Sequence, residues 1–258
     1  MANDDMKVIT IMTRKGGAGK TTLAQALISA ALSDGKRCLA LDADPQQGLH
    51  RWLHPLAKDN PLIESRQLQF ANDLEQWTEE AYEAGNVDYV FVDTQGSAGD
   101  WADELAAHSD FLVVPMKLAD KDLTITVDTF NWYVGLRSRV DDAELLPTLR
   151  VILADVPSKP TATQREIEKN ALEQFPIMTN YFMHRNQHLD ADKKGFLHVQ
   201  AEDKRNSSFG LGKTHAQYFD EAVAEARDIL SEIIVEAGPD VDGNAESQGM
   251  SAEISGRG

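Results

Sequence analysis

The chain has 258 residues, of which 42% are hydrophobic and 26% charged, a composition typical of an ordinary globular protein. This composition excludes a disordered, a collagen-like and a membrane-spanning chain, and the length suffices to bury a core without disulfide or metal staples. The 25 Lys and Arg residues against 42 Asp and Glu residues give a formal net charge of −17. The surface as a whole therefore does not attract nucleic acid phosphates, and any DNA contact needs a local basic patch.

Cysteine content and the ends of the chain narrow the class further. Cys38 is the single cysteine, which excludes a disulfide framework and a cysteine-ligated metal cluster within one chain. No stretch approaches the ~20 apolar residues of a membrane span. The first residues, 1–5, are acidic and polar and do not form a secretory signal. We expect a cytoplasmic protein without a membrane partner.

Short apolar runs alternate with helical patterns along the chain. Strands are predicted at Val8–Met12, Cys38–Leu41, Tyr89–Val92, Phe111–Pro115 and Leu149–Ala154, with a weaker one at Ile177–Phe182. Helices are predicted at about Lys20–Ser33, Asn72–Ala84, Asp120–Val140, Thr161–Gln174 and Thr214–Val235. This alternation predicts an α/β fold with a mostly parallel, doubly wound sheet and helices on both faces. We expect residues 1–237 to form one domain and 238–258, rich in Gly, Ser, Asn and acidic residues, to be a disordered polar tail.

A glycine-rich segment joins the first predicted strand to the first predicted helix. It reads Lys15-Gly16-Gly17-Ala18-Gly19-Lys20-Thr21-Thr22, a variant of the phosphate-binding loop, because residues 12–14 stand where the strict pattern has its leading glycine. The glycines let backbone N–H groups turn towards a polyphosphate, and the N-terminus of the helix adds its dipole. Lys20 would neutralise the β- and γ-phosphates, and the Thr21 hydroxyl would ligate Mg²⁺.

Three aspartates follow predicted strands. Asp42 and Asp44 come at the end of the second strand, in Leu41-Asp42-Ala43-Asp44-Pro45-Gln46, and Asp93 ends the run that begins at Tyr89. Because ligands of open α/β sheets bind at the carboxyl ends of the strands, we expect these carboxylates beside the phosphate loop. Asp93, in a Walker B arrangement, would hold Mg²⁺ through a water, since Mg²⁺ keeps much of its hydration shell. For Asp44 taken alone, a cap of a following helix stays open as the alternative.

The front lysine, Lys15, gives the loop a form that resembles the deviant Walker A motif of the ParA/MinD superfamily, and residues 42–46 are similar to that family's second motif. The resemblance implies a P-loop NTPase fold, ATP and Mg²⁺ as cofactors, and a homodimer around two ATP molecules that hydrolyses them slowly. It also implies that Lys15 stabilises charge on the partner's nucleotide, that Asp44 orients the attacking water and that Asp42 supports the Mg²⁺ shell. A solvated lysine is the alternative for Lys15. Gln95-Gly96 replace the prolines that the family usually has here, which puts γ-phosphate sensing by this loop in question.

Shorter segments resemble one branch of the superfamily, the VirC-type ATPases of Ti plasmids: Leu49-His50-Arg51-Trp52, Val156-Pro157, Thr163-Gln164-Arg165, Met183-His184-Arg185 and Gly195-Phe196-Leu197-His198. This resemblance implies the positioning of a DNA-transfer complex, and partition relatives imply the segregation of a plasmid or chromosome. DNA would be bound directly or through an adaptor, such as a ParB-like or relaxosome protein.

A basic stretch at 184–213 is the candidate DNA or partner face, although a solvated loop is the alternative. Its basic residues are Arg185, Lys193, Lys194, Lys204, Arg205 and Lys213.

Two other functions stay open. A small-molecule ATP-dependent enzyme of the same superfamily would need a substrate pocket beside the γ-phosphate. A nucleotide-locked scaffold without turnover is motivated by the altered Gln95-Gly96 loop. Two histidine pairs, 50 with 54 and 184 with 188, have a spacing that fits zinc on one helix face, but neither has a third ligand at matching spacing. The residues that contact the base are not predicted.

Overall fold

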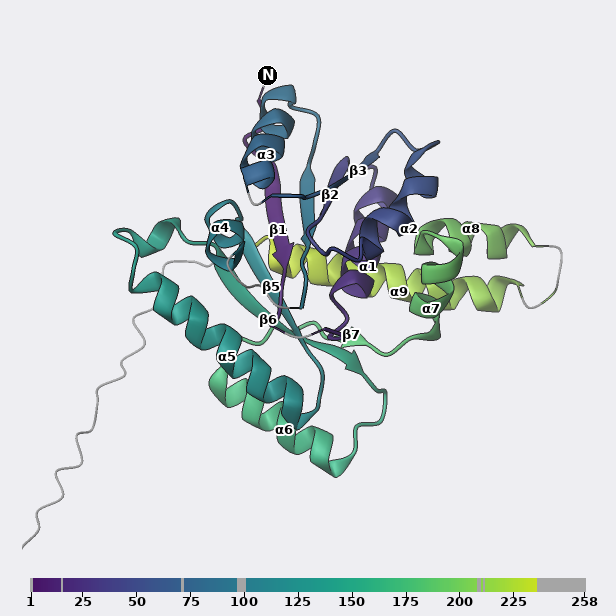
Figure 1. Ribbon diagram of the computed structural model, residues 1–258. Coiled ribbons are helices and arrows are strands. Elements are labelled where there is room, and N and C mark those ends of the chain that lie inside the picture. The colour runs from purple at the N-terminus through teal and green to yellow at the C-terminus, as the bar shows by residue number, and fades with distance from the viewer. Residues whose placement is uncertain are drawn as a thin grey trace, which may run out of the picture.

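Seven parallel strands form a single sheet in the described part of the chain, in the spatial order β3-β2-β4-β1-β5-β6-β7 (Figure 1). The computed structural model describes residues 2–14, 16–70, 72–96, 101–207, 210 and 212–235. The strands are β1 (Lys7–Ile11), β2 (Cys38–Asp42), β3 (Ile63–Gln67), β4 (Tyr89–Asp93), β5 (Phe111–Met116), β6 (Thr148–Val156) and β7 (Phe182–Met183). Neighbouring strands pair in parallel throughout, which confirms the predicted α/β fold.

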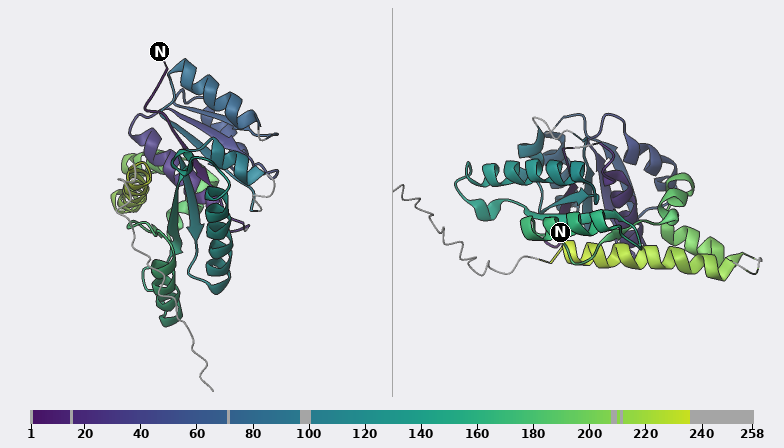
Figure 2. Two further views of the ribbon diagram at one scale, coloured as in Figure 1. Left: turned by 90° about the vertical axis from the view of Figure 1, so that its left-hand side faces the viewer. Right: turned by 90° about the horizontal axis from the view of Figure 1, so that it is seen from below.

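Helices cover both faces of the sheet, as a doubly wound fold requires (Figure 2). They are α1 (Lys20–Ser33), α2 (Gly48–Ala57), α3 (Asn72–Ala84), α4 (Ala102–Ala107), α5 (Asp120–Arg137), α6 (Ala162–Gln174), α7 (Asn186–Lys194), α8 (Leu197–Asn206) and α9 (Gly212–Ile233), with a short 3-10 helix, η2, at Ala143–Leu145. One face packs against α1, α2, α7, α8 and α9, and the other against α3, α4, α5 and α6. None of the helices in the described ranges is long and apolar enough to cross a membrane.

The core is divided by the sheet because successive side chains of a strand point to opposite faces. In β5, Phe111 and Val113 pack towards α1 and α9, whereas Leu112 and Val114 pack towards α5 and α6. Cys38 is buried on the α1 face, where burial raises the pKa of its thiol. This cysteine therefore contributes to packing, as its apolar surroundings in the sequence indicate.

The strongest sequence patterns locate their elements well. Five strands and five helices lie within three residues of their predicted bounds. The run Ile177–Phe182 is an exception, since only Phe182–Met183 is a strand and Ile177 makes an isolated bridge. The chain bends at Thr179 and Asn180, whose N–H groups donate to the carboxylate of Glu232 on α9.

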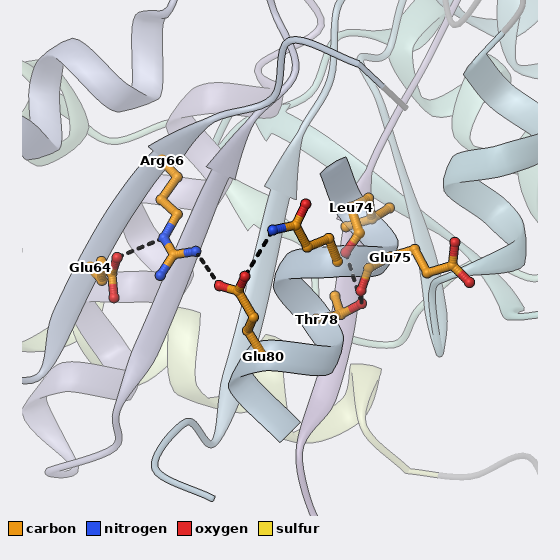
Figure 3. A network of polar contacts seen from close by, with 7 residues as sticks. Glu64, Arg66, Leu74, Glu75, Thr78 and Glu80 are labelled. Carbon is orange, nitrogen blue, oxygen red and sulfur yellow. Dashed lines mark hydrogen bonds and ion pairs between the residues drawn. The ribbon is translucent and has the colours of Figure 1, made fainter. Parts of the chain in front are cut away.

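Strand β3 was not predicted because it lies at the edge of the sheet and lacks an apolar run. Of its residues, Ile-Glu-Ser-Arg-Gln, Ile63 alone is buried. Arg66 binds Glu64 at 2.6 Å and Glu80 of α3 at 3.0 Å (Figure 3). Its guanidinium also lies 5.4 Å from the centre of the Trp77 ring. Charged side chains on an edge strand disfavour pairing with another sheet, so this network both holds α3 and protects the edge.

Candidate nucleotide-binding site

The phosphate loop lies between β1 and α1, at the carboxyl edge of the sheet. Gly17 has φ 79° and Gly19 has φ 93°, both in the left-handed region that favours glycine. Gly19 is the N-cap of α1 and no side chain caps this helix end. The first N–H groups of an α-helix point out of its N-terminus, and the helix dipole favours negative charge there. Lys15, the front lysine of the motif, lies outside the described residues.

The carboxylate of Asp93 interacts with the side chains of Lys20 and Thr21, the first two residues of α1. The Thr21 hydroxyl donates a hydrogen bond of 2.6 Å to Oδ2 of Asp93, which is 1% exposed. Oδ1 of Asp93 is buried and has no hydrogen-bond partner among the described residues. Burial raises the pKa of Asp93 to about 7. A hydroxyl beside a buried carboxylate oxygen that accepts no hydrogen bond offers the oxygen ligands that a hydrated Mg²⁺ prefers.

Lys20 is 6% exposed, which is unusual for a lysine in a globular protein. Burial lowers its pKa, and the nearby carboxylates of Asp93 and Asp44 oppose that change. The structure therefore brings together a buried ammonium and two of the three predicted aspartates. Phosphate oxygens placed at the loop would meet this ammonium as a point charge.

The third aspartate, Asp42, is fully buried at the end of β2, opposite Asp93 of β4 in the strand register. Its two oxygens accept the backbone N–H groups of Asp44 and His50, each at 2.9 Å. Asp44 is half-buried on the loop between β2 and α2, and its Oδ1 accepts the N–H of Gln46 at 2.8 Å. All three predicted aspartates thus lie at one edge of the sheet, but with different surroundings.

A cavity of about 220 Å³ adjoins the phosphate loop on its β6 and β7 side. It is lined by Ala18, Gly19 and Thr22 of the loop and by Lys117, Ala154, Asp155, Phe182, Met183, His184, Arg185, His188 and Leu189. The Asp155 carboxylate binds Lys117 Nζ at 3.1 Å and His184 Nδ1 at 2.5 Å. Asp155 has φ 57°, and the register between β6 and β7 shifts next to it. A non-glycine residue with a left-handed backbone is uncommon and often marks a functional site.

The sequence did not predict Lys117, Asp155 and His184 as site residues. They lie at or just after the ends of β5, β6 and β7, so the two crossovers that join these three strands bring them together. No local spacing indicates this contact. The one available signal is that each lies at the carboxyl end of an apolar run, where ligands of such sheets bind.

One histidine of each pair contacts a strand, His50 with Ser65 of β3 and His188 with Phe182 of β7. His50 Nδ1 lies 2.8 Å from the Ser65 hydroxyl, and the His188 ring lies 4.5 Å from the Phe182 ring. The described ranges contain no group of three or more His, Cys, Asp or Glu residues that would hold a metal ion. The contacts of His50 and His188 indicate packing roles for these two side chains.

His188 predicts a specific pH dependence of stability. It is 7% exposed, its Nε2 has no hydrogen-bond partner among the described residues, and burial lowers its pKa to about 4. Below pH 6.5, His188 is protonated in the unfolded chain but stays neutral in the folded chain. The free energy of unfolding therefore falls as the pH drops towards 4. The free energy of unfolding in urea should fall between pH 7.5 and pH 5. This fall should be about 2 kcal/mol smaller in His188→Gln than in the wild type. Exposed His54→Gln is the control and should behave as the wild type, whereas equal losses in His188→Gln and wild type would contradict this prediction.

Within the candidate basic face at 184–213, residues Asn186–Lys194 form α7 and Leu197–Asn206 form α8, where a loop was the alternative. Three of its basic residues have acidic partners, namely Arg185 with Glu225 and Glu221, Lys194 with Asp190, and Arg205 with Asp220. For Lys193, Lys204 and Lys213 the described residues show no ion pair. The positive potential of this face is therefore weaker than its basic residues alone suggest.

Known proteins resemble the chain over most of its length. The family model of the VirC1 protein matches residues 6–237. Protein virC1 of Rhizobium rhizogenes is 27% identical over 197 residues, which cover 75% of this chain and 84% of that protein. The solved structure of pnob8 ParA has a TM-score of 0.61 at 17% identity and covers 88% of this chain and 99% of its own. An ATP complex of a Cyanothece McdA variant has a TM-score of 0.59 at 17% identity and covers 86% and 96%.

These similarities agree with the geometry of the site. The likeness to the solved structures shows a shared fold, the α/β fold of ParA and MinD P-loop NTPases. The match to the family model includes every described residue of the phosphate loop and all three aspartates. The resemblance that the sequence motifs indicate is confirmed, and the chain belongs to the VirC1 protein family.

Proposed function

We propose that this protein is an ATPase that dimerises with ATP and positions DNA, either a segregating plasmid or chromosome or a DNA-transfer complex. The observation that carries the proposal is the Asp93 carboxylate. One of its oxygens accepts the Thr21 hydroxyl, and the other is buried without a partner among the described residues, near the buried Lys20. A purely structural cluster would satisfy its buried acceptors, so this arrangement favours a bound ligand. Membership of the VirC1 family and the shared ParA fold support the same function.

Different groups of the phosphate loop and of the adjoining cavity would bind different parts of ATP. Backbone N–H groups of Gly16, Gly17, Ala18, Gly19, Lys20, Thr21 and Thr22 would bind the phosphates. The Lys20 ammonium would neutralise charge on the β- and γ-phosphates. The cavity beside Asp155 would hold the nucleoside, because it begins at Ala18 and Gly19 and is large enough for the flat base to enter.

The metal and the attacking water would lie on the aspartate side. Thr21 would ligate Mg²⁺ directly and Asp93 through a water, and Asp42 would support this shell from further away. Mg²⁺, when bound, reduces the negative charge of the phosphates that the nucleophile must approach. Asp44 would orient the water, and Lys15 of the second subunit would stabilise the charge of the transition state.

Phosphate release from Mg²⁺ and ATP tests the proposal directly. The purified wild-type protein should release phosphate from ATP slowly, and removal of Mg²⁺ should stop the release. Bound ATP without any turnover would contradict hydrolysis and support the nucleotide-locked scaffold. Turnover that begins only after a cell extract of small molecules is added would support the small-molecule enzyme.

DNA or adaptor binding is the finer part of the proposal, and the least acidic face supports it. Lys193, Lys204 and Lys213 are the residues of this face that show no ion pair in the described ranges. The double variant Lys193→Glu/Lys194→Glu should weaken binding of ATP-loaded protein to duplex DNA at low salt, with a reduced salt dependence. Unchanged affinity would remove this face from the proposal. The same titration with ADP checks that any binding depends on the nucleotide.

A further inference from the structure

The bonds of Asp42 distinguish it from the other aspartates of the site. Asp42 is 0% exposed, and both of its oxygens already accept backbone N–H groups, from Asp44 and from His50. Asp93 is equally buried, but one of its oxygens has no hydrogen-bond partner in the described part of the chain. Both carboxylate oxygens of Asp42 thus already accept backbone hydrogen bonds, whereas one carboxylate oxygen of Asp93 can still bind a ligand.

These two bonds fix both ends of the loop that carries Asp44. At its start, Asp42 holds the N–H of Asp44 itself, and the N–H of Ala43 binds the carbonyl of Asp93 at 2.8 Å. At its end, Asp42 holds the N–H of His50 in the first turn of α2. Between them the chain makes a turn with Gln47 at φ 55°, a left-handed conformation that is costly for a side-chain-bearing residue. A loop with such a turn needs outside contacts to keep one conformation.

Helix α2 is a firm support for this loop. The Trp52 indole N–H donates to the carbonyl of Ala191 in α7 at 2.9 Å, and the Trp52 ring meets the Phe196 ring edge-on with centres 5.3 Å apart. Gly195 lies so close to α2 that a Cβ there would be 2.8 Å from a methyl group of Leu56. Helix α2 is thus packed tightly between β3 and the segment that links α7 to α8. Asp42 ties the Asp44 loop to a helix that has little freedom to move.

We infer that Asp42 is a positioning residue, which holds Asp44 where it orients the attacking water. The inference rests on the proposed ATPase function, and it replaces the support of the Mg²⁺ shell that the family resemblance implies for Asp42, because both oxygens of this carboxylate already accept backbone N–H groups. Loss of the Asp42 carboxylate frees the loop, and the Asp44 side chain then moves away from the position where it orients the attacking water. Phosphate and metal binding, which depend on α1 and Asp93, keep their geometry.

Asp42→Asn tests this role, because asparagine keeps the shape but puts an amide donor against one of the two N–H groups. We expect kcat for ATP hydrolysis to fall roughly tenfold to a hundredfold, with KM for ATP and the half-saturating Mg²⁺ concentration within about twofold of wild type. Amide hydrogen exchange in residues 43–50 should become roughly tenfold faster. Asp110→Asn is the matched control, since the Asp110 carboxylate also accepts a backbone N–H, from Val8 at 2.6 Å, at the opposite end of the sheet.

The outcomes separate this role from the others. A rise in half-saturating Mg²⁺ with unchanged exchange in 43–50 would overturn the inference and assign Asp42 to the metal shell. Unchanged kcat and exchange would overturn it as well. If the wild type does not hydrolyse ATP, the proposed function fails, while the exchange measurement still decides whether Asp42 holds the loop. In the Asp44→Ala background, Asp42→Asn should cause no further loss of hydrolysis, and an additive loss would contradict the inference.

Discussion

Lys20→Ala is expected to weaken ATP binding at least about a hundredfold, measured by calorimetric titration in the presence of Mg²⁺. The reason is burial, because the Lys20 ammonium is 6% exposed and lies near Asp93 and Asp44. Phosphate oxygens in the loop would replace water around this ammonium, and a charged hydrogen bond of this kind costs several kcal/mol when one partner is removed. The variant also removes the ammonium that opposes the negative charge of Asp93 and Asp44.

Lys36→Ala is the matched control for this loss. Lys36 forms an exposed ion pair with Asp88 at 3.3 Å, at the opposite end of β2. Exposed pairs contribute little, so this variant should bind ATP as the wild type does. Equal binding by Lys20→Ala and Lys36→Ala would show that the glycine-rich segment is a turn without a ligand.

Asp44→Ala is expected to lower kcat for ATP hydrolysis by a factor of about a hundred or more while ATP stays bound. Asp44 is the half-buried member of the three aspartates, so its carboxylate is reachable by a water that the fully buried Asp42 cannot touch. Orientation and proton acceptance by one side chain typically contribute factors of 10² to 10⁴. Phosphate release and equilibrium nucleotide binding, measured on the same protein, separate the two effects.

Asp142→Ala provides the matched comparison. The Asp142 side chain accepts the N–H two residues ahead, from Glu144 at 2.9 Å, as that of Asp44 does from Gln46, but it caps η2 away from the site. Its loss should leave hydrolysis unchanged. Full activity in Asp44→Ala would leave Asp44 a structural role alone. That role is the turn bond to Gln46 and not the helix cap that the sequence left open, because the N-cap of α2 is Gln47.

The sequence predicts those parts of the site that are continuous in the chain. The motif at 15–22 predicts a strand, a loop and a helix in that order, because phosphate binding needs glycines and Gly-Lys-Thr at fixed positions. Asp42, Asp44 and Asp93 are predicted because parallel strands bring their carboxyl ends to one edge. These positions depend on local geometry and on one general rule of the fold.

Features that arise from packing between distant segments were missed. The contacts of Asp155 with Lys117 and His184 join residues at the ends of three strands, and their sequence spacing has no pattern. One oxygen of Asp42 accepts a backbone N–H from α2, a helix that the sequence did not predict, and the other accepts the N–H of Asp44 in the preceding loop. Strand β3 has the polar composition of an edge, and α7 and α8 are short helices with few buried apolar residues. In each case the tertiary contact, and not the local preference, decides the structure.

The molecular mass of Asp44→Ala in solution, measured by light scattering with Mg²⁺ and either ATP or ADP, tests the central claim most directly. With hydrolysis blocked, ATP should remain in the loop and the protein should be a dimer, while ADP should leave it a monomer. This result would support a switch in which Lys15 of each subunit acts on the nucleotide of the other. A monomer with both nucleotides, when ATP is shown to be bound, would contradict the account.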